Sequence, residues 1–392
     1  MSYKQLISLF ICNLIPFIVG NSLMSLMPIY IGEEIGAGSI AAGVIISIAF
    51  AALAISTIIG GNVARVFHKR STGITLSAFI CIPSVWFMGQ TTNIVVFTIL
   101  FGMVWFFSGV QLVLTQIIAA HTSHNDQRGW IFGVLGTAGA LAALIGGMTA
   151  GEIVLHWDYE ALFLVCTIAY VMVIIASMVI SDVEQEPVEK KLTLPTPKKP
   201  FDISQAIIIL ILASSVAHVA SFIIGMARPL MMNNLNFDPS AITSVIAISG
   251  LISLPLPIVA GWLSDKFGRK PILIGAYLVT AIGAGLFLSA DTLVQFWVAQ
   301  AFFSVLACTM VVGTAFVMDT VSTENVDMGV SFFATTPWIG AVIGSTTGGF
   351  SMEYLGTTVT FEIAIALIIV AVFLSMIVRS ERKLYLQPAM QA

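Results

Sequence analysis

Residues 261–271 read Gly261-Trp262-Leu263-Ser264-Asp265-Lys266-Phe267-Gly268-Arg269-Lys270-Pro271 and form a short charged stretch between two long apolar runs. A weaker copy, residues 61–71, lies 200 positions earlier and also separates two apolar runs. The two copies share an opening glycine, a phenylalanine and a closing basic pair. The chain therefore uses the same charged element twice.

The composition excludes a water-soluble fold. Apolar residues make up 58% of the chain and charged residues 9%, whereas a soluble domain carries roughly a quarter charged residues; the mean hydropathy is +1.01. The apolar runs are long enough for bilayer-crossing helices, which need about 20 residues each. They are too uniformly apolar for barrel strands, which alternate over about ten residues. Because lipid admits only helices or closed barrels, the sequence predicts an all-α membrane protein.

Twelve membrane-spanning helices are expected, six on each side of a polar connector. Their ranges are 5–31, 39–63, 72–90, 93–120, 129–155, 159–181, 204–231, 239–263, 271–290, 292–318, 328–352 and 358–378. The connector is rich in proline, lysine and acids, a composition typical of an irregular linker. The expected organisation is an N-terminal six-helix bundle at 1–181, a cytoplasmic linker at 182–203, a C-terminal six-helix bundle at 204–380 and a cytoplasmic tail at 381–392.

The basic residues predict the orientation, because lysine and arginine prefer cytoplasmic loops. With the N-terminus inside, 15 of the 16 basic residues fall on the cytoplasmic side, and only Arg228 falls towards the outside. The outer loops carry acids instead, namely Glu33, Glu34, Glu152, Asp158, Glu160, Asp238, Asp291 and Glu353. One miscounted span would scramble this division. We therefore expect a multi-pass protein of the cell (plasma or inner) membrane with both termini in the cytoplasm.

The two halves of the chain repeat one another. Pro28 matches Pro229 at an offset of 201 residues, each near the outer end of the first span of its half. Gly146-Gly147 matches Gly348-Gly349 at an offset of 202, each late in the fifth span. Such steady offsets indicate duplication of a six-helix unit. Parallel six-span halves are an architecture of secondary transporters, whose site lies near the bilayer midplane between the halves.

With twelve spans, a central linker and this loop, the sequence resembles the major facilitator superfamily. The loop pattern of that family is a glycine, an aspartate four residues on, then a glycine and two basic residues. The residues that fit it are Gly261, Asp265, Gly268, Arg269 and Lys270. The copy between spans two and three departs from the pattern, because Arg65 stands in place of the aspartate and His68 in place of the glycine.

The charged loop at residues 261–271 can act as a latch between the two halves. Its glycine lets a neighbouring helix approach closely, and its aspartate can pair with basic groups or a helix N-terminus on the adjacent bundle. Such a latch would hold an outward-facing state, closed on the cytoplasmic side. The candidate latch residues are Gly261, Asp265, Gly268, Arg269, Lys270, Gly61, Arg65 and Arg70. The alternative is that the basic residues only anchor the topology.

Spans five and eleven carry small residues at steps of four. Residues 138–147 and 340–349 resemble the glycine-rich fifth span of the family's drug:proton antiporters, although both lack its proline. Small residues four apart also allow tight helix crossings in lipid. The pattern is therefore either an exporter mark or simple close packing.

Span seven carries the main polar stripe. Its members, at steps of four and three that place them on one helix face, are Ser214, His218, Ser221, Gly225 and Arg228. The resemblance places the first and fourth helix of each half around a central cavity. His218 titrates near neutral pH and can carry a coupled proton or bind substrate; the alternative is a neutral histidine bonded to another helix. Arg228 can attract an anionic group, snorkel to the interface or pair with an outer acid.

Other spans offer uncharged candidates for the same cavity. They are Asn13 and Asn21 with Phe17 in span one, Trp105 with Ser108, Gln111 and Thr115 in span four, and Gln300 with Ser304 in span ten. A chamber with many hydrogen-bonding groups and little fixed charge suits a neutral or amphipathic organic molecule. No acid lies in the middle of spans one, four, seven or ten. Coupling therefore uses His218 or rim acids, or the protein is a uniporter.

The expected function is secondary transport of a small organic solute by alternating access, with proton-coupled export as the first choice. Proton-coupled or facilitative uptake of a nutrient is the alternative, and a receptor or channel is a distant one. The absence of a His-Glu-x-x-His or other catalytic set argues against an enzyme, and the absence of a Walker-type loop argues against ATP-driven pumping. No cofactor or metal is expected. The expected partners are a small-molecule substrate, protons and the lipid bilayer, with no nucleic acid, for a monomeric protein.

Overall fold

The first half of the chain forms six helices. The computed structural model describes residues 1–66, 69–123, 127–181, 205–321 and 326–378. The helices of this half are α1 (Tyr3–Glu33), α2 (Ser39–Val66), α3 (Arg70–Met88), α4 (Ile94–Thr122), α5 (Arg128–Trp157) and α6 (Tyr159–Val179). Each coincides with a predicted span to within a few residues at its ends. The predicted linker at 182–203 and tail at 381–392 lie outside the described residues.

The second half also contains six spans, several of them broken. Its helices are α7 (Gln205–Asn234), α8 (Pro239–Ser253), α9 (Leu256–Phe267), α10 (Arg269–Leu288), α11 (Leu293–Phe303), η2 (Ser304–Leu306), α12 (Ala307–Thr320), α13 (Val326–Ala334) and α14 (Thr336–Ile377). Helices α8 and α9 form one span bent by 42° around Pro255, which lacks a backbone donor. Helix α14 holds two spans, because Gly356 has φ 78° and ψ 179° and reverses the chain.

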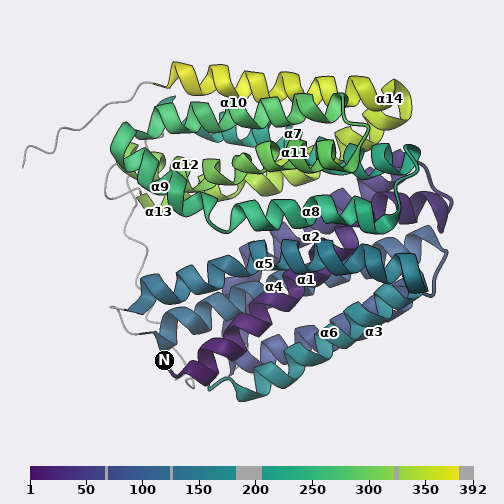
Figure 1. The fold of residues 1–392 in the computed structure, drawn as a ribbon. Helices are drawn as coiled ribbons and strands as arrows, with labels where there is room; N and C mark the ends of the chain where they lie inside the picture. The colour runs from purple at the N-terminus through teal and green to yellow at the C-terminus, as the bar shows by residue number, and fades with distance from the viewer. Residues whose placement is uncertain (67–68, 124–126, 182–204, 322–325, 379–392) are drawn as a thin grey trace, which may run out of the picture.

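The helices group into two bundles, α1–α6 and α7–α14, which lie one above the other in Figure 1. The halves repeat the same internal contacts. Asn13 of α1 donates through Nδ2 to the carbonyl of Leu135 on α5 at 2.9 Å. Ser214 of α7 bonds the hydroxyl of Thr336 on α14 at 2.7 Å, and both of its members lie 201 positions later in the chain. The predicted pair of pseudo-symmetric six-helix bundles is thereby confirmed.

Polar side chains cap the N-termini of four helices that follow tight turns. Asn93, Asp158 and Asp238 accept backbone N–H groups in the first turns of α4, α6 and α8, and Thr292 forms a capping box with Gln295 at α11. These side chains satisfy donors that have no partner within the helix. All four turns lie at the same end of the molecule, which fixes the spacing of the spans there.

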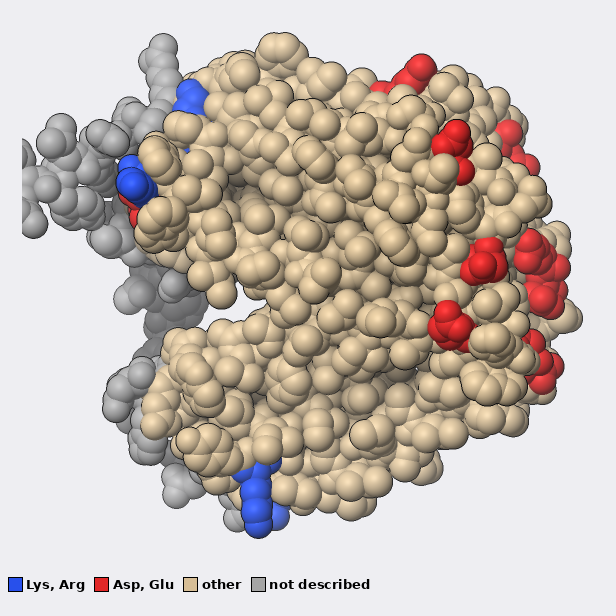
Figure 2. Space-filling model, viewed as in Figure 1, with Lys and Arg blue, Asp and Glu red and all other residues tan. Residues whose placement is uncertain are grey.

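Charge is divided between the two ends of the bundles. Figure 2 shows lysine and arginine at the end that holds the N-terminus and most of the acids at the opposite end. We call these ends the basic face and the acidic face. The described basic-face cations are Lys4, Lys69, Arg70, Lys266, Arg269 and Lys270. The space-filling surface is open between the halves towards the basic face and closed towards the acidic face; we call this opening the chamber.

Two glycine seams join the halves on the acidic side, α5 against α8 and α2 against α14. A Cβ on Gly147 would lie 2.4 Å from the backbone nitrogen of Ala247, and a Cβ on Gly349 would lie 2.5 Å from the carbonyl oxygen of Ser39. No side chain fits there, so the backbones of opposite halves touch directly. This arrangement supports the close-packing interpretation of the small residues in spans five and eleven.

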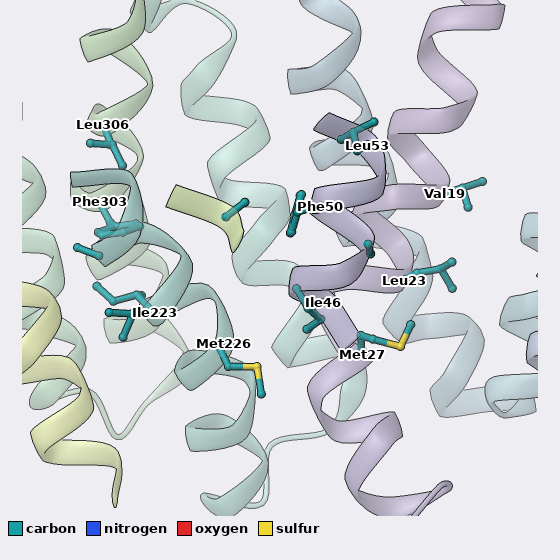
Figure 3. Packing of buried hydrophobic residues seen from close by; sticks show 14 of the residues in the cluster. Val19, Leu23, Met27, Ile46, Phe50, Leu53, Ile223, Met226, Phe303 and Leu306 are labelled. Carbon is teal, nitrogen blue, oxygen red and sulfur yellow. The ribbon is translucent and has the colours of Figure 1, made fainter. Parts of the chain in front are cut away.

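Apolar side chains of both halves fill the region beside these seams. Figure 3 shows buried side chains of α1, α2 and α7, among them Met27, Ile46 and Met226. The rings of Phe50 on α2 and Phe222 on α7 lie in edge contact across the halves, with centroids 4.9 Å apart. Towards the acidic face, the chamber is therefore closed by apolar side-chain packing as well as by the backbone seams.

Candidate functional site

The polar stripe of α7 lies between two packed sides of the helix. On one side His218 and Phe222 pack against the glycines of α14. On the other side Arg228 donates to the amide oxygen of Gln300 on α11. Between them Gly225 is exposed, and a Cβ built on it would meet no atom within 4 Å. Of the residues in the predicted stripe, Gly225 is exposed and Ser221 is half-buried, whereas Ser214, His218 and Arg228 are buried.

His218 is buried and held by its own helix. Its Nδ1 lies 2.8 Å from the carbonyl oxygen of Ser214, and a carbonyl only accepts, so Nδ1 carries the hydrogen. The bond to a neighbouring helix comes from Ser214, which binds Thr336. The alternative of a histidine bonded directly to another helix is therefore not what the described residues show. This tautomer leaves Nε2 as the nitrogen that can bind a proton or accept a hydrogen bond from a substrate.

Arg228 is buried, with 6% of its surface exposed, and it belongs to a neutral hydrogen-bond network. Gln300 accepts from its Nη1 and donates to Ser304 at 3.1 Å. The hydroxyl of Ser304 donates to the backbone carbonyl of Gln300 at 2.7 Å and lies 3.1 Å from the hydroxyl of Ser249 on α8. No ion pair joins Arg228 to a carboxylate in the described part of the chain, and its Nε has no partner there. The guanidinium therefore neither snorkels to the surface nor pairs with an outer acid.

Of the span-one and span-four candidates, Trp105 borders the junction of the halves, whereas the hydrogen bond of Asn21 lies within α1. Asn21 is half-buried and donates to the carbonyl of Phe17 at 2.8 Å, which leaves its oxygen for another donor. Trp105 packs on α1 at Gly20 and lies 4.8 Å, centroid to centroid, from Phe50 of the cross-half aromatic pair. Asn13, by contrast, is buried between α1 and α5.

The polar face of α4 has hydrogen-bond partners in its own half. Ser108 bonds Tyr170 on α6 at 2.7 Å, and the buried Gln111 donates to the sulfur of Cys81 on α3 at 3.9 Å. Thr115 bonds the carbonyl of Gln111 on its own helix. Ser108, Gln111 and Thr115 thus contact groups inside the N-terminal half, and Oε1 of Gln111 is buried without a partner among the described residues; that this face lines the chamber stays a prediction.

Contacts between the halves at the acidic face were not predicted. Glu353 of α14 accepts from the backbone nitrogen of Ser39 at the start of α2 at 2.9 Å. Glu152 of α5 accepts from the hydroxyl of Ser240 in the first turn of α8. The two contacts are related by the internal repeat. Glu353 lies 201 positions after Glu152, and Ser240 lies 201 positions after Ser39. We call these two contacts, Glu353 with Ser39 and Glu152 with Ser240, the outer lock. The offset of 201 residues that relates Pro28 to Pro229 is the sequence signal that could have identified it.

The described residues of the charged loop pair within their own half. Arg269 forms ion pairs with Asp265 and, at 3.1 Å, with Asp319 of α12. Lys270 donates to the carbonyls of Met376 and Val378 at 2.6 and 2.7 Å. Among the remaining latch candidates, Gly268 forms the turn between α9 and α10, Gly261 is in ordinary contact with α12, and Arg70 is buried at the start of α3. Gly61 and Arg65 lie in α2, where their side chains are outside the described part.

A family model described as Major Facilitator Superfamily matches residues 9–209 and 210–391. Among curated proteins, the chain is similar to the multidrug resistance protein MdtG of Escherichia fergusonii, with 24% identity over 277 residues. The protein of the same name from Salmonella arizonae is 26% identical over 277 residues. These alignments cover 66% of this chain and 66% of the length of each relative.

Solved structures share the fold. The nucleoside transporter NupG superimposes with a TM-score of 0.79 at 14% identity, covering 96% of this chain and 98% of the other. A D-xylose–proton symporter superimposes with a TM-score of 0.76 at 14% identity, covering 97% of each chain.

Proposed function

Because this chain belongs to the Major Facilitator Superfamily, we propose that it is a secondary active transporter that moves a small organic solute by alternating access. The observation that carries the proposal is the pair of pseudo-symmetric halves, which meet on the acidic face and part on the basic face. Two rigid halves that close one side and open the other around a central site are the device by which such proteins expose a substrate alternately.

The charge division supports the orientation within the proposal. Basic residues mark the cytoplasmic side of membrane proteins, so the basic face and both termini lie in the cytoplasm. The protein is then a component of the cell membrane. In this orientation the structure represents the inward-open state. The ion pairs that Arg269 of the charged loop forms within its own half belong to that state, in which the cytoplasmic latch is released.

Proton-coupled export is the favoured direction. The curated relatives are named as multidrug resistance proteins, and His218 is a buried imidazole of α7 whose Nε2 can take up a proton. Uptake of a nutrient is the second candidate, which is favoured by the fold shared with a nucleoside transporter and a sugar–proton symporter.

The test is a transport assay on the purified full-length protein in proteoliposomes of known orientation. A drug and metabolite panel should include solutes whose movement across the vesicle membrane depends on the protein and accelerates when a pH gradient is imposed. The sign of the gradient that accelerates movement separates export from uptake. A panel that moves no faster than in empty vesicles, with or without a gradient, would refute secondary transport.

Changing His218 to alanine should abolish the pH dependence of transport while leaving expression intact. His218 is the histidine of the α7 stripe, and its Nε2 can take up a proton, so its removal leaves the driving proton without a carrier. Initial rates at several imposed pH gradients measure the effect. His121→Ala, at the end of α4, is the matched control and should behave as the wild type. An unchanged gradient dependence in His218→Ala would remove this residue from coupling.

Changing Asp265 to asparagine should shift the population further towards the inward-open state. In that state Arg269 keeps its second partner, Asp319, so the fold tolerates the change. In the opposite state the carboxylate would be missing from the latch. Accessibility of single cysteines placed on the two faces to an impermeant reagent measures the shift, with Asp291→Asn on the acidic face as the control. Equal labelling of Asp265→Asn and wild type would refute the latch.

A further inference from the structure

We propose that Arg228 and Gln300 form the docking point for an anionic group of the cargo, so that the transported solutes are organic carboxylates, phosphates or phosphonates. This inference rests on the proposed transport function and narrows its substrate class. It follows from the charge, the burial and the asymmetry of one side chain.

The guanidinium of Arg228 is a buried charge without a counter-charge. Arginine stays protonated in proteins, and an uncompensated charge deep in a membrane protein is unfavourable and marks function by default. Across the described ranges the guanidinium forms no ion pair, its Nε is fully buried without a hydrogen-bond partner, and Nη1 reaches only the neutral amide of Gln300. We infer that the missing counter-charge is supplied by an anionic group of a ligand.

The donors around Arg228 match an oxyanion. A guanidinium presents its N–H groups in a planar fork that binds carboxylate or phosphate oxygens in pairs, and Nε is one prong without a partner here. Gln300 can turn its amide so that the NH₂ group, which now donates to Ser304, faces the same ligand. The hydroxyl of Ser304 donates its one hydrogen within the network, where the backbone carbonyl of Gln300 lies 2.7 Å away, and so holds Gln300 in place. Neutral amide and hydroxyl groups add hydrogen bonds without cancelling the charge.

In the proposed site a ligand enters along the neighbours of Arg228 on its own helix face. Gly225 lies one helical turn before it on the same face and opens on empty space, and Ser221, one turn earlier, is half-buried. In the proposed pose a solute lies against Ser221 and Gly225, with Arg228 towards the acidic face and His218 towards the basic face. The stripe therefore holds an anion-binding group and a proton-binding group on one surface.

Arg228 has no charged counterpart in the first half of the chain. Some side chains that join the halves recur at the internal offset, as Glu152 and Glu353 do in the outer lock. At the offset of 201 residues, Arg228 corresponds to Met27, a buried apolar residue of α1. The equivalent helix position of the first half thus carries no charge, which sets Arg228 apart from the duplicated framework.

The experiment measures melting temperatures of the full-length protein in zwitterionic phosphatidylcholine nanodiscs. The probes are benzoate and phenylphosphonate, matched against neutral benzyl alcohol and cationic benzylamine. Only the two anions should raise the melting temperature of the wild type. Arg228→Gln should weaken their apparent affinity by about 10- to 100-fold, the usual effect of losing hydrogen bonds to a charged group. Lys4→Gln, which removes an exposed cation at the start of α1, should leave it unchanged.

The decisive variant is Gln300→Glu, which gives Arg228 a carboxylate of its own. If the arginine serves cargo, this variant melts at the wild-type temperature or higher but no longer responds to either anion. A Gln300→Glu protein that still binds both anions as the wild type does would overturn the proposal, as would a wild type that responds equally to all four probes or to none.

Two further arms separate other sources of failure. Nanodiscs that contain phosphatidylglycerol test the lipid headgroup: if this lipid alone raises the melting temperature through Arg228 and abolishes the response to the soluble anions, the site belongs to lipid and the cargo assignment is wrong. Transport is scored separately in proteoliposomes. Movement of neutral solutes without anion binding would refute the substrate class alone, whereas anion binding without any movement would refute the proposed transport function.

Discussion

Joining α2 to α14 through a disulfide between positions 47 and 346 should abolish transport completely and reversibly. The hydroxyls of Ser47 and Thr346 lie 2.7 Å apart across the two halves, and Ser47 also donates to the carbonyl of Val342 at 2.7 Å. Side chains this close can meet the short Cβ separation of a disulfide, which is about 3.8 Å. If the halves must part on the acidic side in every cycle, a covalent bond there leaves the protein inward-open.

The measurement is transport by a Ser47→Cys, Thr346→Cys double variant after oxidation and again after reduction. The four native cysteines are buried and free and are replaced by alanine beforehand. The matched control joins Thr75 to Ser177, whose hydroxyls are also 2.7 Å apart but lie on α3 and α6 of the same half. That cross-link should leave transport unchanged. Full transport by the quantitatively cross-linked 47–346 variant would refute the rocking of two rigid halves.

The spans could be predicted because lipid permits few solutions. A chain that crosses a bilayer must satisfy its backbone within helices of about 20 apolar residues, so composition and run length sufficed to place twelve of them. The bend at Pro255 and the 3₁₀ turn at Ser304–Leu306 were not predicted, since the apolar run is continuous through both. Breaks of this kind depend on how neighbouring helices pack.

Helical periodicity groups the residues from Ser214 to Arg228 on one face, but it does not tell which of them are packed: the structure exposes Gly225 and buries Ser214, His218 and Arg228. The same holds for Ser108 and Gln111, because periodicity shows that polar residues share a face but not which neighbour they contact. Their partners, Tyr170 and Cys81, are polar groups on other spans that the sequence does not place beside α4.

Contacts that depend on the conformational state were beyond the reach of the sequence. Asp265 pairs with Arg269 in this state, whereas the sequence suggested a partner in the adjacent bundle. The outer lock at Glu152 and Glu353 exists only while the acidic face is closed. A sequence contains the residues for both states at once and does not indicate which pairs coexist. The internal offset is the exception, because a contact in one half predicts its counterpart in the other.

The paired glycines of spans five and eleven show how one helix serves both states. Gly146 packs on α1 within its own half, and the next residue, Gly147, packs on α8 of the other half. Gly348 and Gly349 divide in the same way between α7 and α2. The first glycine of each pair holds a bundle together throughout the cycle, while the second contributes to a seam that must form and separate. Substitution of the second glycine should therefore change the balance between states more than it changes the fold of either half.

Changing Gly147 to valine should shift the protein away from the inward-open state. The first added carbon would lie 2.4 Å from the nitrogen of Ala247, and overpacking of this kind disfavours the closed seam by about 1–3 kcal/mol. That energy corresponds to an about 5- to 150-fold change in the ratio of the two states. The readout is a single cysteine at position 47, which is buried in the other seam. An impermeant maleimide applied from the acidic face should label it faster, because rigid halves open both seams together. Gly139→Val, on the same helix but with empty space at its Cβ, should label as the unsubstituted protein does; equal labelling of both variants would show that the seams do not move as one.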